Sequence, residues 1–537
     1  MLKLTAVIWV VLCPFFLIAQ SVDIQWGESI DSKTEILRII GEDQDQNVYA
    51  LAYKSKKYYL EKYKGNELVA SFSKEIVFPE IDDRDQNLLN IYLLDNKLVA
   101  ISEVFLKKTD EYLVNGYGIS LSGIMEKKPV ELLRISAKTR SKAGITGTQI
   151  SQDRSLFLVS NVSFDDKDQN DISIQVFNNE FKRQNHFDEK VTIKNKAEKA
   201  YVTIGNFVLD NTGSMYYTKE VMYYKGSFTF SSSMLNDRDY SVVHLNEEGF
   251  KQEIPVTLKN LKVAQMGLKV DENNNIKLGG FYYKKQERGL FKGVYLRGSF
   301  FVLIDGKTRK KLAENAVEFS EDMMLEYRSE KQIDKGVYLD NNFYVKEMVN
   351  KDNGGTIIIA EYFTVVYGET RMGLQPVNYY YGDLIVVNVN KEGEIEWSKA
   401  IFKNQLYTQT RLNLGAFVGG LSVMASIPVS NDETIYFSYL VDVVGDDIVF
   451  IFNDNGANTN LDLPRRKTKA LKVPKKGIPM IVTFDKKGTM SKEPLAKSLK
   501  GEVIMRPRVS YVNTDNDTIV VYGSKSGDDK LGRLSIR

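Results

Sequence analysis

The chain has 537 residues, of which 43% are hydrophobic, and its 72 Lys and Arg nearly balance 70 Asp and Glu to give a formal net charge of +2. So balanced a charge argues against nucleic acid as a partner, because contacts to phosphates depend on a basic field. The single cysteine, Cys13, lies near the N-terminus, so the rest of the chain has no disulfide and no cysteine metal ligand.

Residues 1–19 are typical of a signal peptide. Lys3 supplies the positive start, the run from Leu4 to Ile18 is almost wholly apolar, and Ala19 offers a small residue for cleavage. No later stretch has the roughly 20 apolar residues of a membrane helix. We therefore predict export to the periplasm, the outer membrane or the medium. The mature chain, residues 20–537, is predicted not to be an integral membrane protein.

A four-strand unit recurs along the rest of the chain. A strand with alternating apolar residues runs into a turn rich in Asp and Asn, such as LDNTG or VDENNN, and a β-branched strand follows. After a variable gap come a third strand, another turn and a fourth strand. These turn residues suit tight hairpins. Clear copies begin at Val202, Ala264, Phe343 and Leu421, and weaker copies begin near Ile36, Leu88, Ile145 and Ile504.

Eight units of four strands, about 45 to 75 residues apart, predict an all-β fold, a single β-propeller of about eight four-stranded blades, with seven as the alternative. SEDMMLEYRSEK from Ser320 predicts one short helix between units. The last unit stops after its third strand, and IQWGESI from Ile24 matches IEWSKAI from Ile395, the fourth strand of the sixth unit. We therefore expect the N-terminal strand to close the ring, which removes two exposed sheet edges.

Several of these turns resemble those of a known group. LDNTGSMYYT and VDENNNIKLGG resemble the Asp-x-x-Gly-x-x-Tyr turns of exported bacterial β-propellers, and GEIEWSKAI resembles the outer strand of quinoprotein-type repeats. The resemblance covers nearly the whole mature chain and implies a fold, not an activity. The tryptophans expected around a quinone cofactor are absent, since the mature chain keeps only Trp26 and Trp397. No cofactor is therefore predicted.

The topology predicts which face of the ring binds a partner. With strands named A to D from the central channel outward, the short A–B and C–D turns share one face, and the B–C loops and D–A connections share the other. The B–C gaps are long and irregular, and the longest is an insertion at residues 442–477 of the seventh unit. Because variable loops on a rigid scaffold collect binding residues, we expect binding on the B–C face.

Two groups of side chains on that face are candidates for partner binding. The basic half of the insertion, PRRKTKALKVPKK, predicts a docking arm for an acidic partner or a phosphate-bearing surface; a solvated, flexible loop is the alternative. The tyrosines of NYYYG favour contact with protein or glycan, unless they pack within their strand. The predicted partner-binding residues are Arg465, Arg466, Lys467, Lys469, Lys472, Lys475, Lys476, Tyr379, Tyr380 and Tyr381.

Three Asp-rich stretches look alike but fall at different places in the unit. GEDQDQN from Gly41 aligns with the other A–B turns, so turn chemistry explains it. DDRDQN from Asp82 is a D–A connection, and DDKDQND from Asp165 is a B–C loop. Neither has the full spacing of an EF-hand loop. The candidate ligands for Ca²⁺, or for a cationic ligand, are Asp82, Asp83, Asp85, Asp165, Asp166 and Asp168.

No catalytic residue is predicted. The mature chain has two histidines, His186 on a D strand and His244 on a C strand, and separate blades cannot assemble them into a triad or zinc site. We therefore expect a non-catalytic binding or scaffold propeller that contacts an envelope or extracellular protein, or a glycan, as a monomeric ring or a subunit of an assembly. Two alternatives stay open. One is a hydrolase or lyase acting on glycan or peptide, with acidic residues at the channel mouth. The other is an accessory subunit of a cell-envelope assembly.

Overall fold

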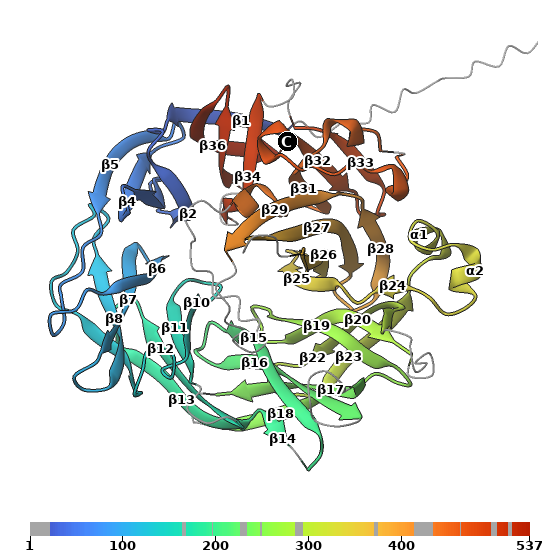
Figure 1. Cartoon of the computed structure of the whole chain (residues 1–537), viewed down its shortest axis with the longest axis horizontal. Helices are drawn as coiled ribbons and strands as arrows, with labels where there is room; N and C mark the ends of the chain where they lie inside the picture. Colours follow the sequence, from blue (N-terminus) through green and yellow to red (C-terminus); the bar gives the residue numbers. More distant parts are fainter. Residues whose placement is uncertain are drawn as a thin grey trace, which may run out of the picture.

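The computed structural model describes residues 22–163, 168–195, 197–225, 234–246, 250–284, 294–369, 374–412, 433–461, 463–495, 502–513 and 518–536. Eight antiparallel sheets with four main strands each follow one another around a ring, as predicted (Figure 1). The fold is an all-β propeller of eight blades. Within the described residues, helix is confined to two short α-helices and four 3-10 turns.

The first four blades follow the chain in order. Their strands, from the channel outward, are β2 (Glu35–Glu42), β3 (Val48–Lys54), β4 (Lys57–Lys64) and β5 (Val69–Glu75) in blade 1; β6 (Asn87–Leu94), β7 (Lys97–Leu106), β8 (Glu111–Ile119) and β9 (Val130–Ser136) in blade 2; β10 (Ile145–Ile150), β11 (Leu156–Ser163), β12 (Gln169–Asn178) and β13 (Arg183–Thr192) in blade 3; and β15 (Ala200–Leu209), β16 (Met215–Lys225), β17 (Met234–Leu245) and β18 (Lys251–Val256) in blade 4.

The last four blades complete the ring. Their strands are β19 (Lys262–Val270), β20 (Ile276–Tyr283), β22 (Gly298–Ile304) and β23 (Lys311–Glu318) in blade 5; β25 (Phe343–Asn350), β26 (Thr356–Tyr367), β27 (Leu374–Val389) and β28 (Ile395–Ile401) in blade 6; β30 (Leu440–Val444), β31 (Asp447–Asp454), β32 (Ile478–Phe484) and β33 (Met490–Pro494) in blade 7; and β34 (Val503–Asn513), β35 (Thr518–Lys525), β36 (Asp528–Ile536) and β1 (Val22–Ser29) in blade 8.

The remaining elements are short and lie beside the blades. They are β14 (Lys194–Asn195), which pairs with β15; β21 (Tyr295–Leu296) and β24 (Leu339–Asp340), which pair with each other; β29 (Gln405–Leu412), which pairs with β27; the helices α1 (Glu321–Leu325) and α2 (Glu330–Ile333); and the 3-10 turns η2 (Glu433–Tyr436), η3 (Gly456–Asn458), η4 (Arg465–Lys467) and η5 (Pro474–Lys476). The predicted helix after Ser320 is thus confirmed, as two helices rather than one.

The N-terminal strand closes the ring, as predicted. β1 pairs antiparallel with β36 as the outermost strand of blade 8, with Ile24 opposite Leu534 and Trp26 opposite Gly532. The last blade is therefore built from both ends of the sequence. The order β1-β36-β35-β34 gives blade 8 its fourth strand, so that it has as many main strands as the other blades.

Glycines make room for the tryptophan of the closing strand. A Cβ added to Gly532 would lie 2.7 Å from Cγ2 of Ile24 and 3.0 Å from Cε3 of Trp26, and one added to Gly523 would lie 3.0 Å from Cη2 of Trp26. The indole therefore rests against the backbone of β35 and β36. A side chain at either glycine would push β1 away from the blade.

The hydrophobic core is divided among the junctions between blades. Each of eight clusters of buried residues joins one blade to the next, and one of them joins blade 8 to blade 1. In β26, Ile357 and Ile359 face blade 7, whereas Ile358 and Ala360 face blade 5. The second strand of a blade is buried on both sides, which explains why these strands read as continuous apolar runs.

Aspartates fold the A–B turns of three blades by the same contacts. Asp43, Asp210 and Asp271 each accept hydrogen bonds from the backbone N–H groups two and four positions further on. In blades 1 and 4, the other carboxylate oxygen accepts the hydroxyl proton of Tyr49 or Tyr216, at 3.0 and 3.2 Å. The Asp-x-x-Gly-x-x-Tyr pattern is therefore a turn motif that also satisfies a buried tyrosine.

The strands of blade 7 begin later than the sequence predicts. The segment from Leu421 is expected to form its first two strands, but these are β30 and β31, joined by a two-residue turn in which Gly445 has a φ of 62°. Residues 413–432 lie outside the described residues. The predicted insertion at 442–477 is accordingly wrong at its start, because residues 442–454 contain strand, and the B–C loop covers residues 455–477. The apolar alternation before Leu440 has the period of a strand pair, which is why the sequence places the blade too early.

No helix in the described ranges is long and apolar enough to cross a membrane.

Candidate functional site

The long loop of blade 7 carries all seven cations predicted to bind a partner. It joins β31 to β32 and is described apart from residue 462. We call residues 463–477, which hold the cations, the basic loop. The B–C loops predicted to be long in blades 4, 5 and 6 include residues 226–233, 285–293 and 370–373, which lie outside the described residues.

Leu471 fastens the basic loop to blade 6. Its backbone N–H donates to the carbonyl of Asn404 at 2.8 Å, and its own carbonyl accepts from the N–H of Leu406 at 3.0 Å. Its side chain is 3% exposed and packs with Tyr381 and Phe437. These contacts hold the loop against β29 and do not fit the alternative of a flexible, solvated loop.

Arg465 provides a second anchor. Its Nε donates to Oδ2 of Asp383 in blade 6 at 2.5 Å, its guanidinium lies 4.4 Å from the ring centroid of Tyr327, and its backbone N–H donates to Oε2 of Glu326, just after α1, at 3.0 Å. Burial raises the pKa of Asp383, and the guanidinium opposes this shift. The charge of Arg465, predicted to bind a partner, is therefore used to hold the loop. The contact also places a B–C loop beside a D–A connection, on one face, as the topology predicts.

The other six cations of the basic loop are exposed to solvent. They form no ion pair with any residue that the structure describes; they are Arg466, Lys467, Lys469, Lys472, Lys475 and Lys476. The loop between β31 and β32 has one carboxylate, Asp462, which lies outside the described residues. Leu461 and Val473, in the same loop, are 39% and 47% exposed. An anchored loop thus presents a concentrated positive charge together with apolar side chains.

The three predicted tyrosines lie on an extension of blade 6 that the sequence did not reveal. β27 pairs with β28 through one half and with β29 through the other. Tyr381 is buried and stacks on Phe437 at 5.8 Å, so its ring belongs to the packing. Tyr379 is half-buried and stacks on Tyr407 at 6.0 Å. Tyr380 is half-buried, and alternation places it on the opposite side of the strand.

The predicted calcium ligands of the second stretch form a tight turn. Asp82 and Asp83 have φ values of 49° and 59°, and Ile81 and Arg84 exchange backbone hydrogen bonds at 3.0 Å. Two central residues with positive φ define a type I′ turn, which favours Asp. Asp83 lies 3.8 Å from an exposed lysine ammonium, and Asp85 is exposed.

The third stretch offers less for a metal. Asp165 and Asp166 lie outside the described residues, and Asp168 directly precedes β12; its carbonyl accepts hydrogen bonds from the N–H groups of Ile193 and Lys194. Across the described ranges, no group of three or more His, Cys, Asp or Glu side chains is placed to hold a metal ion. The calcium site therefore stays a prediction that these residues do not support.

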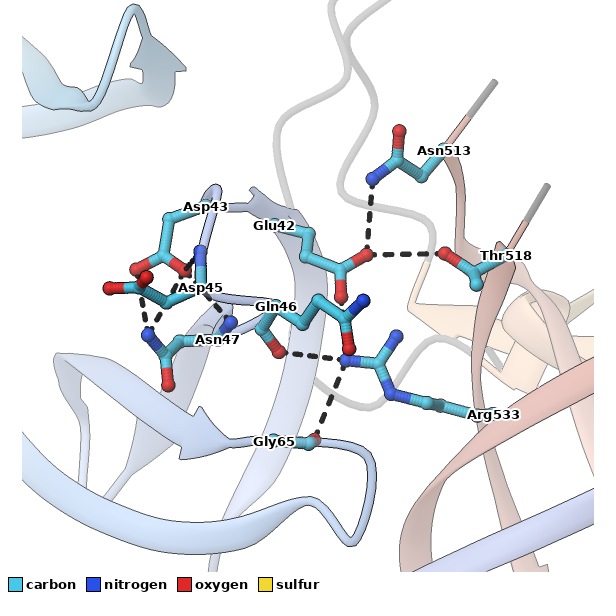
Figure 2. A network of polar contacts seen from close by, with 9 residues as sticks. All are labelled: Glu42, Asp43, Asp45, Gln46, Asn47, Gly65, Asn513, Thr518 and Arg533. Atoms are coloured by element: carbon cyan, nitrogen blue, oxygen red, sulfur yellow. Dashed lines mark hydrogen bonds and ion pairs between the residues drawn. The ribbon is translucent and has the colours of Figure 1, made fainter. Parts of the chain in front are cut away.

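The first stretch, GEDQDQN, belongs to the ring closure. Figure 2 shows Glu42 at the end of β2, reaching from blade 1 to the strands of blade 8. Its carboxylate is fully buried, and Arg533 donates to Oε1 at 2.6 Å while Asn513 and Thr518 donate to Oε2 at 3.1 and 3.2 Å. Arg533 also donates to the carbonyl of Gln46 at 2.8 Å. The turn that looked like a metal loop thus helps to join the first blade to the last.

A buried ion pair lies where blade 6 leads into blade 7. Nζ of Lys403 lies 2.6 Å from Oε1 of Glu361, and both side chains are at most 1% exposed. Gln405 accepts from Lys403 at 3.1 Å, and Ser438 donates to Oε2 of Glu361 at 3.0 Å. Both oxygens of Glu361 are therefore occupied, as a buried charge requires.

The innermost strand of blade 6 brings a lysine to the channel. Lys346 is the extra residue of a β-bulge in β25, and its Nζ lies 5.1 Å from the ring centroid of Phe363 and 5.9 Å from that of Tyr344. The next residue, Glu347, is exposed. Desolvation by the surrounding protein raises the pKa of its carboxyl group, and the charge of Lys269 in blade 5 opposes this shift. The enzyme alternative predicts several acidic side chains at the mouth of the channel. β25, the innermost strand of blade 6, has one acidic residue, Glu347.

The two histidines lie in different surroundings. His244 is 4% exposed; its ring stacks on Tyr216 at 4.7 Å, and its Nε2 lies 3.0 Å from Nη2 of Arg309. Burial, with the nearby guanidinium, lowers the pKa of His244 to about 4. His186 is exposed on β13. His244 is thus a neutral packing residue at ordinary pH.

Comparisons with known proteins find similar solved structures but no matching family. No family model matches the sequence, and no curated protein matches it. Among solved structures, the chain is similar to the Dos1 propeller, with 7% identity over 95% of each chain and a TM-score of 0.36. It is also similar to the WD40 domain of SCAP from fission yeast, with 8% identity, 96% and 98% coverage and a TM-score of 0.34. The polysaccharide lyase Uly1 matches at 11% identity, 85% and 93% coverage and a TM-score of 0.32. Likeness of this degree carries no argument about function.

Proposed function

We propose that the protein is an exported binding module that docks onto an acidic partner protein through the basic loop of blade 7. The observation that carries the proposal is the set of six exposed cations that form no ion pair with the described residues, on a loop anchored by Leu471 and Arg465. A loop held in place before binding loses little conformational entropy on association, so more of its interaction energy appears as affinity.

The side chains beside the cations favour a protein over a glycan. Leu461 and Val473 are substantially exposed and match an acidic surface that also offers apolar side chains, because apolar area excludes water around charged contacts. Charge complementarity of this kind raises the association rate and weakens with salt. We therefore expect a partner whose binding falls steeply between low and high ionic strength.

Export and assembly are part of the same proposal. The signal-peptide pattern of residues 1–19 supports export, and the resemblance of the turns to exported bacterial propellers supports a place in the cell envelope. A closed ring with short turns on one face and an anchored basic loop on the other suits a subunit that presents a docking surface.

A charge-reversal experiment tests the proposal. Lys467, Lys472 and Lys475 are changed to Glu together, and a control variant carries the same change at Lys127, Lys128 and Lys310, which are exposed on the opposite face. We expect the wild type and the control to capture the same acidic protein from envelope extracts and the basic-loop variant to lose it. Equal capture by both variants contradicts the proposal. If the wild type captures an acidic glycan instead of a protein and the basic-loop variant loses it, the partner is a glycan and the proposed protein partner is wrong.

A further inference from the structure

A second excess of positive charge lies on the innermost strands of blades 6 and 8, which line the channel. Lys346 belongs to β25, the innermost strand of blade 6, and Arg508 belongs to β34, the innermost strand of blade 8. Arg508 is exposed, and its Nη1 donates to Oγ1 of Thr434 at 3.2 Å. Thr434 belongs to the connection between blades 6 and 7, so this cation lies toward the face of the B–C loops and D–A connections.

No carboxylate of the described chain neutralises these two cations. The carboxylate of Glu361 stabilises the charge of Lys346 electrostatically. Its two oxygens, however, already accept hydrogen bonds from Lys403 and Ser438. Neither Lys346 nor Arg508 forms an ion pair with the residues described. Burial lowers the pKa of Lys346, and Arg508 and Lys403 lower it further against the effect of Glu361. The lysine therefore feels a local field that an anionic ligand would relieve.

Lys346 and Arg508 both lie where the pairing register of an innermost strand shifts. The innermost strands of blades 1, 2 and 5 also carry a bulge, and there the extra residues are Leu37, Leu89 and Ala264. Bulges redirect a side chain and recur beside binding sites. The irregular stretch of β34 also contains Arg508, and the bulge of blade 6 places Lys346 next to aromatic rings.

The rings determine what kind of anion fits. Tyr344 is 44% exposed, so its ring is accessible next to the lysine, and an aromatic face packs against the flat apolar face of another ring. We propose that Lys346, Arg508 and the ring of Tyr344 form a binding site for an organic carboxylate that carries a ring. The carboxylate pairs with the two cations through charge-assisted hydrogen bonds, and the ring of the ligand packs on Tyr344. A sugar acid and an aromatic acid share this chemistry.

Four small probes test the site in the full ring. Glucuronate and benzoate carry a ring and a carboxylate, acetate has only the carboxylate, and glucose has only the ring. Saturation-transfer NMR detects weak binding of each. We expect saturable binding of glucuronate or benzoate, and the tighter of the two shows whether the natural ligand is a sugar acid or an aromatic acid. Acetate should bind at least 10-fold more weakly, and binding of glucose should not be detected. Equal binding of acetate removes the role of Tyr344 and overturns the proposal, as does the absence of saturable binding of either ring acid.

Variants assign the binding to these residues. Lys346→Met and Arg508→Gln are each expected to weaken the better ring acid about 10-fold or more, while Lys399→Met, at an exposed lysine on the outermost strand of the same blade, leaves it unchanged. Unchanged binding by Lys346→Met overturns the proposal. A second measurement needs no variant: partial acetylation of the wild type followed by peptide mass spectrometry should show Lys346 protected by the ring acid and Lys399 unprotected. Failure of that protection also counts against the site.

Discussion

Changing Arg533 to Met should loosen the junction between blades 1 and 8. Glu42 is fully buried, and Arg533 is its charged donor, at 2.6 Å, beside the two neutral donors Asn513 and Thr518. The substitution leaves a carboxylate oxygen without its ionic partner where solvent does not reach. Removing one half of a buried pair costs about 3 to 5 kcal/mol. Met fills a similar volume, so the loss reports the charge rather than a cavity.

A second substitution separates the charge from the packing. In Glu42→Gln/Arg533→Met, no buried charge remains, and the amide oxygen at position 42 can still accept from Asn513 and Thr518. Replacing a whole buried pair is often close to neutral, so we expect the double variant to regain at least about 2 kcal/mol relative to Arg533→Met. This non-additivity measures the pair itself.

Urea unfolding followed at Trp26 provides the assay. In protein without residues 1–19 that also carries Trp397→Phe, Trp26 is the only tryptophan and reports the closing strand. Arg134→Met is the matched control, because Arg134 is 45% exposed and pairs with Glu111 on the surface; exposed pairs contribute at most about 1 kcal/mol. A loss below about 1 kcal/mol for Arg533→Met, or a double variant no more stable than it, would refute the reasoning.

Three further changes probe other parts of the ring. Gly532→Val should cost about 1 to 3 kcal/mol and shift Trp26 emission to the red, because the new side chain displaces β1. Asp210→Ala should cost about 2 to 3 kcal/mol in urea unfolding, since it leaves two turn N–H groups and the buried hydroxyl of Tyr216 without an acceptor. His244→Gln should reduce the loss of stability between pH 6.5 and 4. In the folded wild type the pKa of His244 is about 4, below its ordinary value of 6.5, so the unfolded chain takes up the proton first as the pH falls. The wild type therefore loses about 3 kcal/mol of stability over this range.

Each of these changes has a control. Gly527→Val should leave Trp26 emission unchanged, because a Cβ there meets no atom within 4 Å; the positive φ of 91° at Gly527 can still lower stability. Asp210→Asn should cost less than Asp210→Ala, because its oxygen still accepts. His186→Gln, at an exposed histidine, should keep the slope of the wild type. A red shift of Trp26 emission in Gly527→Val would contradict the explanation for Gly532. Equal losses of stability in Asp210→Asn and Asp210→Ala would contradict the role of the Asp210 carboxylate. A pH dependence of stability in His244→Gln equal to that of the wild type would contradict the role of His244.

The sequence predicts the ring because its signals are local and repeated. The turn at Asp210 and the matching strands around Trp26 and Trp397 each determine a feature within a few residues, and eight copies reinforce one another. The misplaced strands of blade 7 show the limit. The apolar alternation after Leu421 has the period of a strand pair, and only the pairing of Leu440 with Ile451 decides where the blade begins. That pairing depends on tertiary contacts, which sequence spacing does not carry.

The candidate sites are less predictable for the same reason. The cations of the basic loop are visible as a run in the sequence, but the commitment of Arg465 to Asp383 depends on a residue 82 positions away. The site around Lys346 and Arg508 has no sequence pattern, because its members come from two blades and each lies at a register shift of its strand. Contacts between charges of different blades depend on how the ring closes, so the spacing of residues in the sequence does not predict them.

The closing strand also decides when the molecule can be finished. Glu42 and Arg533 are 491 positions apart, and β1 finds its partner only after the last strand of the chain has formed. Contacts over such separations are slow to form, because the loop between them must close first. A chain that stops within the last blade leaves β1 unpaired and two blade edges open, and open edges invite aggregation and proteolysis. Resistance to protease is therefore expected to depend on the pairing of β1 with β36.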